Sequence, residues 1–260
     1  MTRRALGLVL VLALAACGPR FVRPGAGPAR DPTPWVERLG ALDRSPGRLR
    51  LAGRFRSGPL GSARFGAAVA EGEGLRLDAA AGPFGTAVLS LGCRGDRCLA
   101  YLPAERRAVE LDSGGLWFAR ILLGRVPRVG RPVGAWETPE GGTVLVFAGP
   151  DGWTEEVEWE PGAGRPARAR FLRDGRVEAE LSWDGRVAGA DFAYPAHIRL
   201  KLREPSADYV LEVERVEPAA QIDPELFGLR LPPGVRVERP EETEAWKPTR
   251  TPLWWRAPPG

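Results

Sequence analysis

The stretch Leu49-Arg50-Leu51-Ala52-Gly53-Arg54-Phe55-Arg56 decides the fold class of this chain. Apolar and polar residues alternate with a period of two, as they do in a β-strand that buries one face and exposes the other. Asp174-Gly175 and Asp184-Gly185 each follow another such segment, and both dipeptides are strong hairpin signals. The sequence therefore predicts an antiparallel meander with one apolar face and one wet face.

The composition fits this pattern. The chain has 33 Gly and 26 Pro among 260 residues, a content that favours short strands and many turns over long helices. Two short helices are expected, one over residues 35–42 with Thr33 as a candidate cap, and one over residues 115–123 after Ser113. Residues 222–227 predict a short helical turn. An apolar inner face in such a sheet is either filled by the protein's own helices or holds an apolar ligand.

The N-terminus has the features of an export signal. A basic start at Arg3 and Arg4 is followed by an apolar run that is too short to span a bilayer, which needs roughly 20 apolar residues. Leu14-Ala15-Ala16-Cys17 looks like a bacterial lipobox, in which the cysteine is lipidated and becomes the first mature residue. The alternative is an ordinary signal peptide with a chance cysteine at the cut.

These segments divide the chain. We expect a signal peptide over residues 1–16, a Pro-rich membrane tether over 17–34, one domain over 35–237 and a Pro- and Trp-rich tail over 238–260. In lipoproteins, Asp after the lipidated cysteine usually marks retention in the inner membrane. Gly18 stands there instead, so the resemblance implies the outer membrane, facing the periplasm. Trp254 and Trp255 of the tail could pack on the domain, dock on a partner or lie at a membrane interface.

Charge and cysteine content exclude several classes of function. The formal net charge is +4, and removal of Arg3 and Arg4 with the signal peptide leaves +2, which does not predict nucleic-acid binding. Cys93 and Cys98 flank a turn-like segment, and an oxidising periplasm would allow a disulfide between them; two free thiols are the alternative. No metal site and no cofactor are expected.

No catalytic site is predicted either. The single histidine, His197, lies in a strand-like alternation, and no nucleophile elbow or P-loop is present. The carboxylate pair Glu155 and Glu156 also lies on a strand-like segment and is interpreted as part of a solvated face. We expect a protein that is not an enzyme.

The order of these motifs resembles a known family. A lipobox and tether lead to Leu51-Ala52-Gly53-Arg54-Phe55, then Leu75-Arg76-Leu77 precedes Gly82-Pro83-Phe84-Gly85, and a helix ends at Leu123-Gly124. This resembles the outer-membrane lipoprotein receptor LolB and its relatives, which share their domain with the periplasmic carrier LolA. The resemblance implies a mainly β fold, a curved antiparallel half-barrel with helices covering its open face, around a cavity that takes acyl chains.

The resemblance also assigns site residues. The loop at Pro83, Phe84 and Gly85 matches one in which LolB carries an exposed leucine that helps insert the incoming lipoprotein; the alternative is that Phe84 folds back onto the core. The expected partners are the membrane, through lipidated Cys17, acyl chains or lipidated proteins, and a periplasmic carrier. A structural or assembly lipoprotein that binds an envelope protein is the alternative function. The candidate cavity-lining residues are Leu51, Phe55, Phe65, Leu77, Val88, Leu116, Ile121, Val146, Phe171, Ile198 and Leu200.

Overall fold

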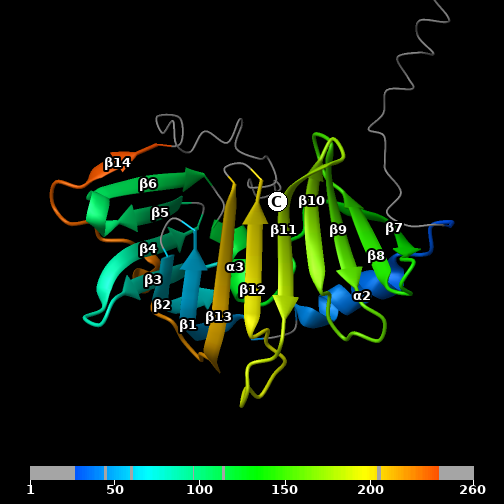
Figure 1. Ribbon diagram of the computed structural model, residues 1–260, viewed down its shortest axis with the longest axis horizontal. Helices are drawn as coiled ribbons and strands as arrows, with labels where there is room; N and C mark the ends of the chain where they lie inside the picture. Colours follow the sequence, from blue (N-terminus) through cyan, green and yellow to red (C-terminus); the bar gives the residue numbers. More distant parts are fainter. Residues whose placement is uncertain are drawn as a thin grey trace, which may run out of the picture.

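A computed structural model describes residues 27–43, 46–58, 61–95, 97–112, 115–203 and 206–239. These residues form one open sheet of fourteen strands in the order β14-β6-β5-β4-β3-β2-β1-β13-β12-β11-β10-β9-β8-β7. Figure 1 shows that the sheet is strongly twisted and curved, and that its two edges do not meet. The predicted mainly β architecture is confirmed, although the sheet is mixed because β14 runs parallel to β6.

The strands and helices follow the predicted order closely. The first half of the sheet contains β1 (Arg48–Ser57), β2 (Gly61–Ala70), β3 (Gly74–Ala81), β4 (Thr86–Arg94), β5 (Arg97–Leu102) and β6 (Arg107–Asp112). The second half contains β7 (Arg131–Glu137), β8 (Thr143–Ala148), β9 (Trp153–Trp159), β10 (Arg168–Arg173), β11 (Arg176–Asp184), β12 (His197–Leu202), β13 (Ala207–Pro218) and β14 (Arg236–Glu238). The helices are α2 (Thr33–Leu42), α3 (Gly115–Leu122), and the short 3-10 turns η1 (Pro103–Glu105) and η2 (Pro224–Phe227).

Strand β1 shows how the sequence alternation becomes burial. Leu49, Leu51 and Phe55 are buried, whereas the arginines between them are exposed. A β-bulge interrupts the pairing of β1 with β13 between Ala52 and Gly53. A Cβ atom on Gly53 would lie 1.9 Å from a backbone oxygen of β13, so only glycine fits this bulge.

Both helices pack against the inner, apolar face of the sheet. The rings of Trp35 on α2 and Trp159 on β9 have their centroids 5.3 Å apart, and those of Trp117 on α3 and Phe171 on β10 are 5.4 Å apart. Helix α2 begins at Thr33, so Thr33 is not the cap that the sequence predicted. Asp31 lies before the helix and accepts hydrogen bonds from the Thr33 backbone N–H and hydroxyl.

The two edge strands are each covered by a segment that is distant in the sequence. At one edge, Arg30 exchanges backbone hydrogen bonds of 2.8 and 3.2 Å with Ala135 of β7. At the other edge, β14 pairs with β6, with Arg236 opposite Arg107. Open edges expose unpaired backbone groups that invite pairing with other chains, so both segments protect the sheet.

Among the described residues, no helix is both long enough and apolar enough to cross a membrane.

Candidate functional site

A cavity of about 340 Å³ lies between α3 and the inner face of one half of the sheet. Its walls come from α3, η1 and seven strands: β1, β3, β4, β5, β6, β12 and β13. Most of the side chains are aliphatic or aromatic. The complete lining is Phe55, Ser57, Leu77, Leu89, Leu91, Ala100, Leu102, Glu105, Arg107, Val109, Leu111, Phe118, Ile121, Leu122, Ile198, Leu200, Leu202, Tyr209 and Leu211.

The polar lining residues lie at one end of this cavity. Ser57 is the last residue of β1, and the register of the hairpins brings it level with the turns that follow β3, β5 and β12. Glu105 and Arg107 flank the turn between β5 and β6 at this same end. We call this end the polar end of the cavity. At the opposite end, the C-terminal turn of α3 supplies the apolar residues Ile121 and Leu122.

An ion-pair cluster occupies the polar end. Arg107 Nη2 lies 2.8 Å from Glu105 Oε2, and Arg107 Nη1 lies 3.3 Å from Glu238 Oε2 on β14. The Glu238 side chain is 11% exposed, and its other oxygen lies 3.5 Å from Arg236 Nε. The covering strand β14 thus contributes a charge that pairs with a residue of the cavity wall, in addition to closing the sheet edge.

The predicted insertion loop forms the hairpin turn between β3 and β4, also at the polar end. Gly82 and Gly85 have φ angles of +71° and +66°, which glycine adopts without strain, and the Gly85 N–H donates to the Gly82 carbonyl at 3.3 Å. Phe84 at the tip is 95% exposed. This exposure excludes the alternative that Phe84 folds back onto the core.

The predicted lining residues have different locations. Phe55, Leu77, Ile121, Ile198 and Leu200 line the cavity. Leu51, Phe65 and Phe171 are buried in the main core outside the cavity wall, and Val88 is partly buried against that core. Val146 is in a small cluster with Trp136 and Val144, separate from the main core. The Leu116 side chain lies outside the described residues.

Val88 was predicted to line the cavity, and a local irregularity of β4 accompanies its absence from the wall. A register shift in the β3–β4 pair places Ala79 opposite Leu89 and Ala80 opposite Ala87, so Val88 is the extra residue of a bulge. Leu89 and Leu91, which lie opposite Ala79 and Leu77 in the regular part of the pairing, line the cavity, and Val88 does not. The bulge depends on cross-strand pairing, which periodicity along one strand does not contain.

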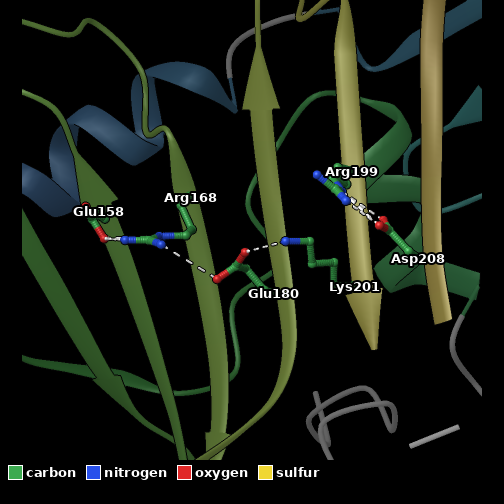
Figure 2. A network of polar contacts seen from close by, with 6 residues as sticks. All are labelled: Glu158, Arg168, Glu180, Arg199, Lys201 and Asp208. Carbon is green, nitrogen blue, oxygen red and sulfur yellow. Dashed lines mark hydrogen bonds and ion pairs between the residues drawn. The ribbon is translucent and has the colours of Figure 1, made fainter. Parts of the chain in front are cut away.

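The outer face of the sheet is covered by cross-strand ion pairs. Figure 2 shows Arg168 of β10 between Glu158 of β9 and Glu180 of β11, with Lys201 of β12 on the other side of Glu180. The distances are 2.6, 3.7 and 3.8 Å, and Arg199 pairs with Asp208 in the same view. Each of these six charges thus has a neighbour of opposite sign, and this part of the outer face is polar.

The prediction of a solvated Glu155–Glu156 pair was wrong. Glu155 is 0% exposed and Glu156 is 7% exposed. Strand β9 lies between β8 and β10, and its alternation points Glu155 into the core, where Oε2 accepts the Val129 N–H at 3.0 Å. Burial raises the pKa of Glu155 to about 8 and also raises the pKa of Glu156, which pairs with Arg170 at 2.9 Å.

The residues Cys93, Cys98 and His197 are not part of the cavity lining. A disulfide joins Cys93 and Cys98, which lie opposite each other in the β4–β5 hairpin with Cα atoms 4.0 Å apart. The exposed His197 has its Nδ1 4.0 Å from Asp184 Oδ2. Within the described ranges, no group of three or more His, Cys, Asp or Glu side chains could hold a metal ion. Cys17, Gly18, Trp254 and Trp255 lie outside those ranges.

An unclosed, curved sheet with helices on its inner face and an apolar cavity beneath one helix defines a half-barrel protein. The chain has a LolA/LolB-type fold. Its structure is similar to a domain from Vibrio parahaemolyticus described as an outer membrane lipoprotein-sorting protein, with a TM-score of 0.51 and 13% identity over 74% of this chain and 94% of that one.

Two further structures are similar at lower scores. A LolA superfamily protein from Nitrosomonas europaea has a TM-score of 0.49 and 12% identity, covering 75% of this chain and 97% of that one. A DUF1329 family protein from Desulfovibrio piger has a TM-score of 0.49 and 10% identity, covering 76% and 98%. The sequence matches no family model and no curated protein. The likeness therefore establishes the fold alone.

Proposed function

We propose that this protein is an outer-membrane lipoprotein that binds acyl chains, or a lipidated client, in its cavity and assists lipoprotein insertion into that membrane. The observation that carries the proposal is the cavity of about 340 Å³, whose wall is apolar except at one end. That volume lies within the range of roughly 300–1,000 Å³ found for small-molecule sites. The description of the similar Vibrio domain as lipoprotein-sorting supports the same role.

Binding would be hydrophobic and would increase with acyl chain length. Each methylene group transferred from water into the cavity contributes about 0.8 kcal/mol. Helices α2 and α3 lie against the inner face, and in this proposal they cover its open side and shield a bound chain from water. The ion pairs on the outer face of β9 to β12 support this assignment because a charged surface suits water, whereas the cavity wall is mostly apolar.

Phe84 would contact the membrane. A phenylalanine that is 95% exposed gains about 2–3 kcal/mol on full transfer to an apolar environment, and the Gly82 and Gly85 turn holds it away from the domain. Lipidated Cys17 would anchor the chain. Arg30 is the first residue fixed to the sheet, and residues 18–30 reach at most about 45 Å when extended. The tether thus allows the loop to approach the bilayer.

The proposal is tested by asking what the cavity contains. The Cys17→Ser variant, which cannot be lipidated, is expected to co-purify with lipid or acylated peptide that native mass spectrometry detects. Ala100→Trp fills the cavity and should abolish this ligand, whereas Ala52→Trp adds the same side chain on the exposed face of β1 and should retain it. An empty cavity in a chain that holds a stable protein partner would replace this proposal with the assembly role.

The membrane step has its own test. Phe84→Ser should leave thermal stability unchanged, because the side chain makes little contact with the domain, and should reduce transfer of a lipidated client into vesicles. The proposal includes no catalytic step, and an acyl ligand recovered in hydrolysed form only in the presence of the protein would contradict it.

A further inference from the structure

The cavity has a direction along which an amphiphile would be oriented. Its charged residues, Glu105 and Arg107, lie at the polar end with Ser57. The opposite end is formed by Ile121 and Leu122. Tyr194, in the connection between β11 and β12, donates a hydrogen bond from its hydroxyl to the Leu122 carbonyl at 2.5 Å. An acyl chain in this cavity would place its tail towards α3 and its head beside Glu105 and Arg107.

The charge of Arg107 is already compensated. Its two terminal nitrogens face Glu105 at 2.8 Å and Glu238 at 3.3 Å, so two carboxylates surround one guanidinium. Arg236 contacts the outer side of Glu238, but its side chain is 77% exposed and its charge is screened by solvent. The Arg107 guanidinium has five N–H donors, and these two contacts use one on each terminal nitrogen. Because Arg107 lines the cavity and its side chain is 25% exposed, a further N–H on a terminal nitrogen can donate to a ligand.

These contacts determine which headgroup fits. A carboxylate at this end would lie beside Glu105, and repulsion between like charges a few ångströms apart in a partly desolvated site is costly. An ester carbonyl or a glycerol hydroxyl carries no net charge and accepts a hydrogen bond from a guanidinium. The cluster therefore favours a neutral head over a free fatty acid.

We propose that the polar end is a headgroup subsite for neutral, ester-linked acyl chains, in which Arg107 donates to the ester and Glu105 and Glu238 exclude carboxylates. This inference rests on the proposed acyl-chain binding and adds the class of lipid that is accepted. The same ester chemistry occurs in glycerolipids and in the diacylglyceryl group of a lipoprotein.

The test compares two ligands with the same tail. Laurate and 1-monolauroylglycerol are titrated into the Cys17→Ser protein at neutral pH, with displacement of a fluorescent acyl probe as the readout. The neutral ester is expected to bind at least about fivefold more tightly. The variant Glu105→Gln/Glu238→Gln should bring the two affinities within about twofold, mainly by strengthening laurate binding.

Matched variants keep the result interpretable. Glu180→Gln makes the same change in charge on the outer face and should leave the ratio at its native value. If the double variant does not fold, Glu105→Gln alone serves, because this side chain is 52% exposed and tolerates the change. Arg107→Met should weaken binding of the ester because it removes the donor, and it should weaken laurate as well because it removes a positive charge beside two carboxylates.

The outcomes separate the two proposals. Equal or tighter binding of laurate by the native chain, or an unchanged ratio in the glutamine variants, overturns the headgroup subsite while acyl binding stands. Failure of both ligands to displace the probe overturns acyl binding and the subsite with it. Once the preference for the ester is found, the same displacement assay compares dipalmitoylglycerol with a dipalmitoylglyceryl-cysteine peptide. Tighter binding of the first indicates a glycerolipid as the natural ligand, and tighter binding of the second indicates a lipoprotein.

Discussion

Glu155→Gln should change how the stability of this protein depends on pH. The Glu155 side chain is fully buried on the inner face of β9, with one oxygen bonded to the Val129 N–H and the other without a partner among the described residues. Burial raises its pKa from 4.5 to about 8. The folded chain therefore keeps a proton that the unfolded chain loses above its ordinary pKa.

The sign follows from this difference. As pH rises from about 4.5 to about 8, unfolding releases a proton, so the free energy of unfolding falls by about 1.4 kcal/mol per pH unit. The full window corresponds to about 3–5 kcal/mol, with the lower value allowing for water penetration around the ionised carboxylate. Below the window and above it, Glu155 adds no further pH dependence.

Glutamine keeps the acceptor for Val129 and does not ionise. Urea unfolding of both chains at a series of pH values should give equal free energies of unfolding below about pH 4.5. Above about pH 8 the variant should be more stable by about 3–5 kcal/mol. Glu156 has a raised pKa in both chains and cancels in the difference. Glu180→Gln on the outer face is the control. Curves for Glu155→Gln and the native chain that stay parallel over the whole window would refute a proton held by Glu155.

Three further substitutions test the fold. Gly53→Ala should lower the free energy of unfolding by at least about 3 kcal/mol, because the new Cβ would lie 1.9 Å from a backbone oxygen. Gly66→Ala is the control and should cost little, because a Cβ there has nothing within 4 Å. Chemical denaturation measures both. Tyr194→Phe should cost about 1–2 kcal/mol through the orphaned Leu122 carbonyl, seen as a lower melting temperature. Cys93→Ala/Cys98→Ala should lose about 2 kcal/mol relative to the oxidised native chain, the value for so short a loop, and the reduced native chain is the control for the change of side chain.

Sequence alternation predicted most of the sheet because each strand buries one face. His197–Leu202 was predicted with the same bounds as β12, and the helix before Leu123 is present as α3. Strand β7 was missed because Pro132 and Gly134 interrupt its alternating pattern. The sheet tolerates Pro132 because β7 is the last strand at one edge of the strand order. Strand β14 has three residues, too few for any period to be visible.

The candidate site was harder to predict than the fold. Hydrophobicity identifies residues that avoid water, but core residues such as Phe171 and cavity residues such as Ile198 carry the same signal. The ion-pair cluster was not predicted at all. Arg107 and Glu238 are 131 positions apart, and only the parallel pairing of β14 with β6 brings them together. The exposure of Phe84 could be predicted, because a bulky residue between Pro83 and Gly85 in a tight turn has few buried positions available. Its role at a membrane stays a prediction.

The way the sheet edges are covered affects the order in which the chain can fold. During synthesis, β6 is complete long before residues 236–238 exist, so its outer edge stays unpaired until almost the whole domain has been made. A contact this distant in sequence also forms slowly, because a long loop must close first. The newly made chain thus passes through a period in which another copy could add a strand at β6. A chaperone that keeps the chain unfolded until synthesis ends would remove this hazard, and a chain ending before Arg236 would retain it permanently.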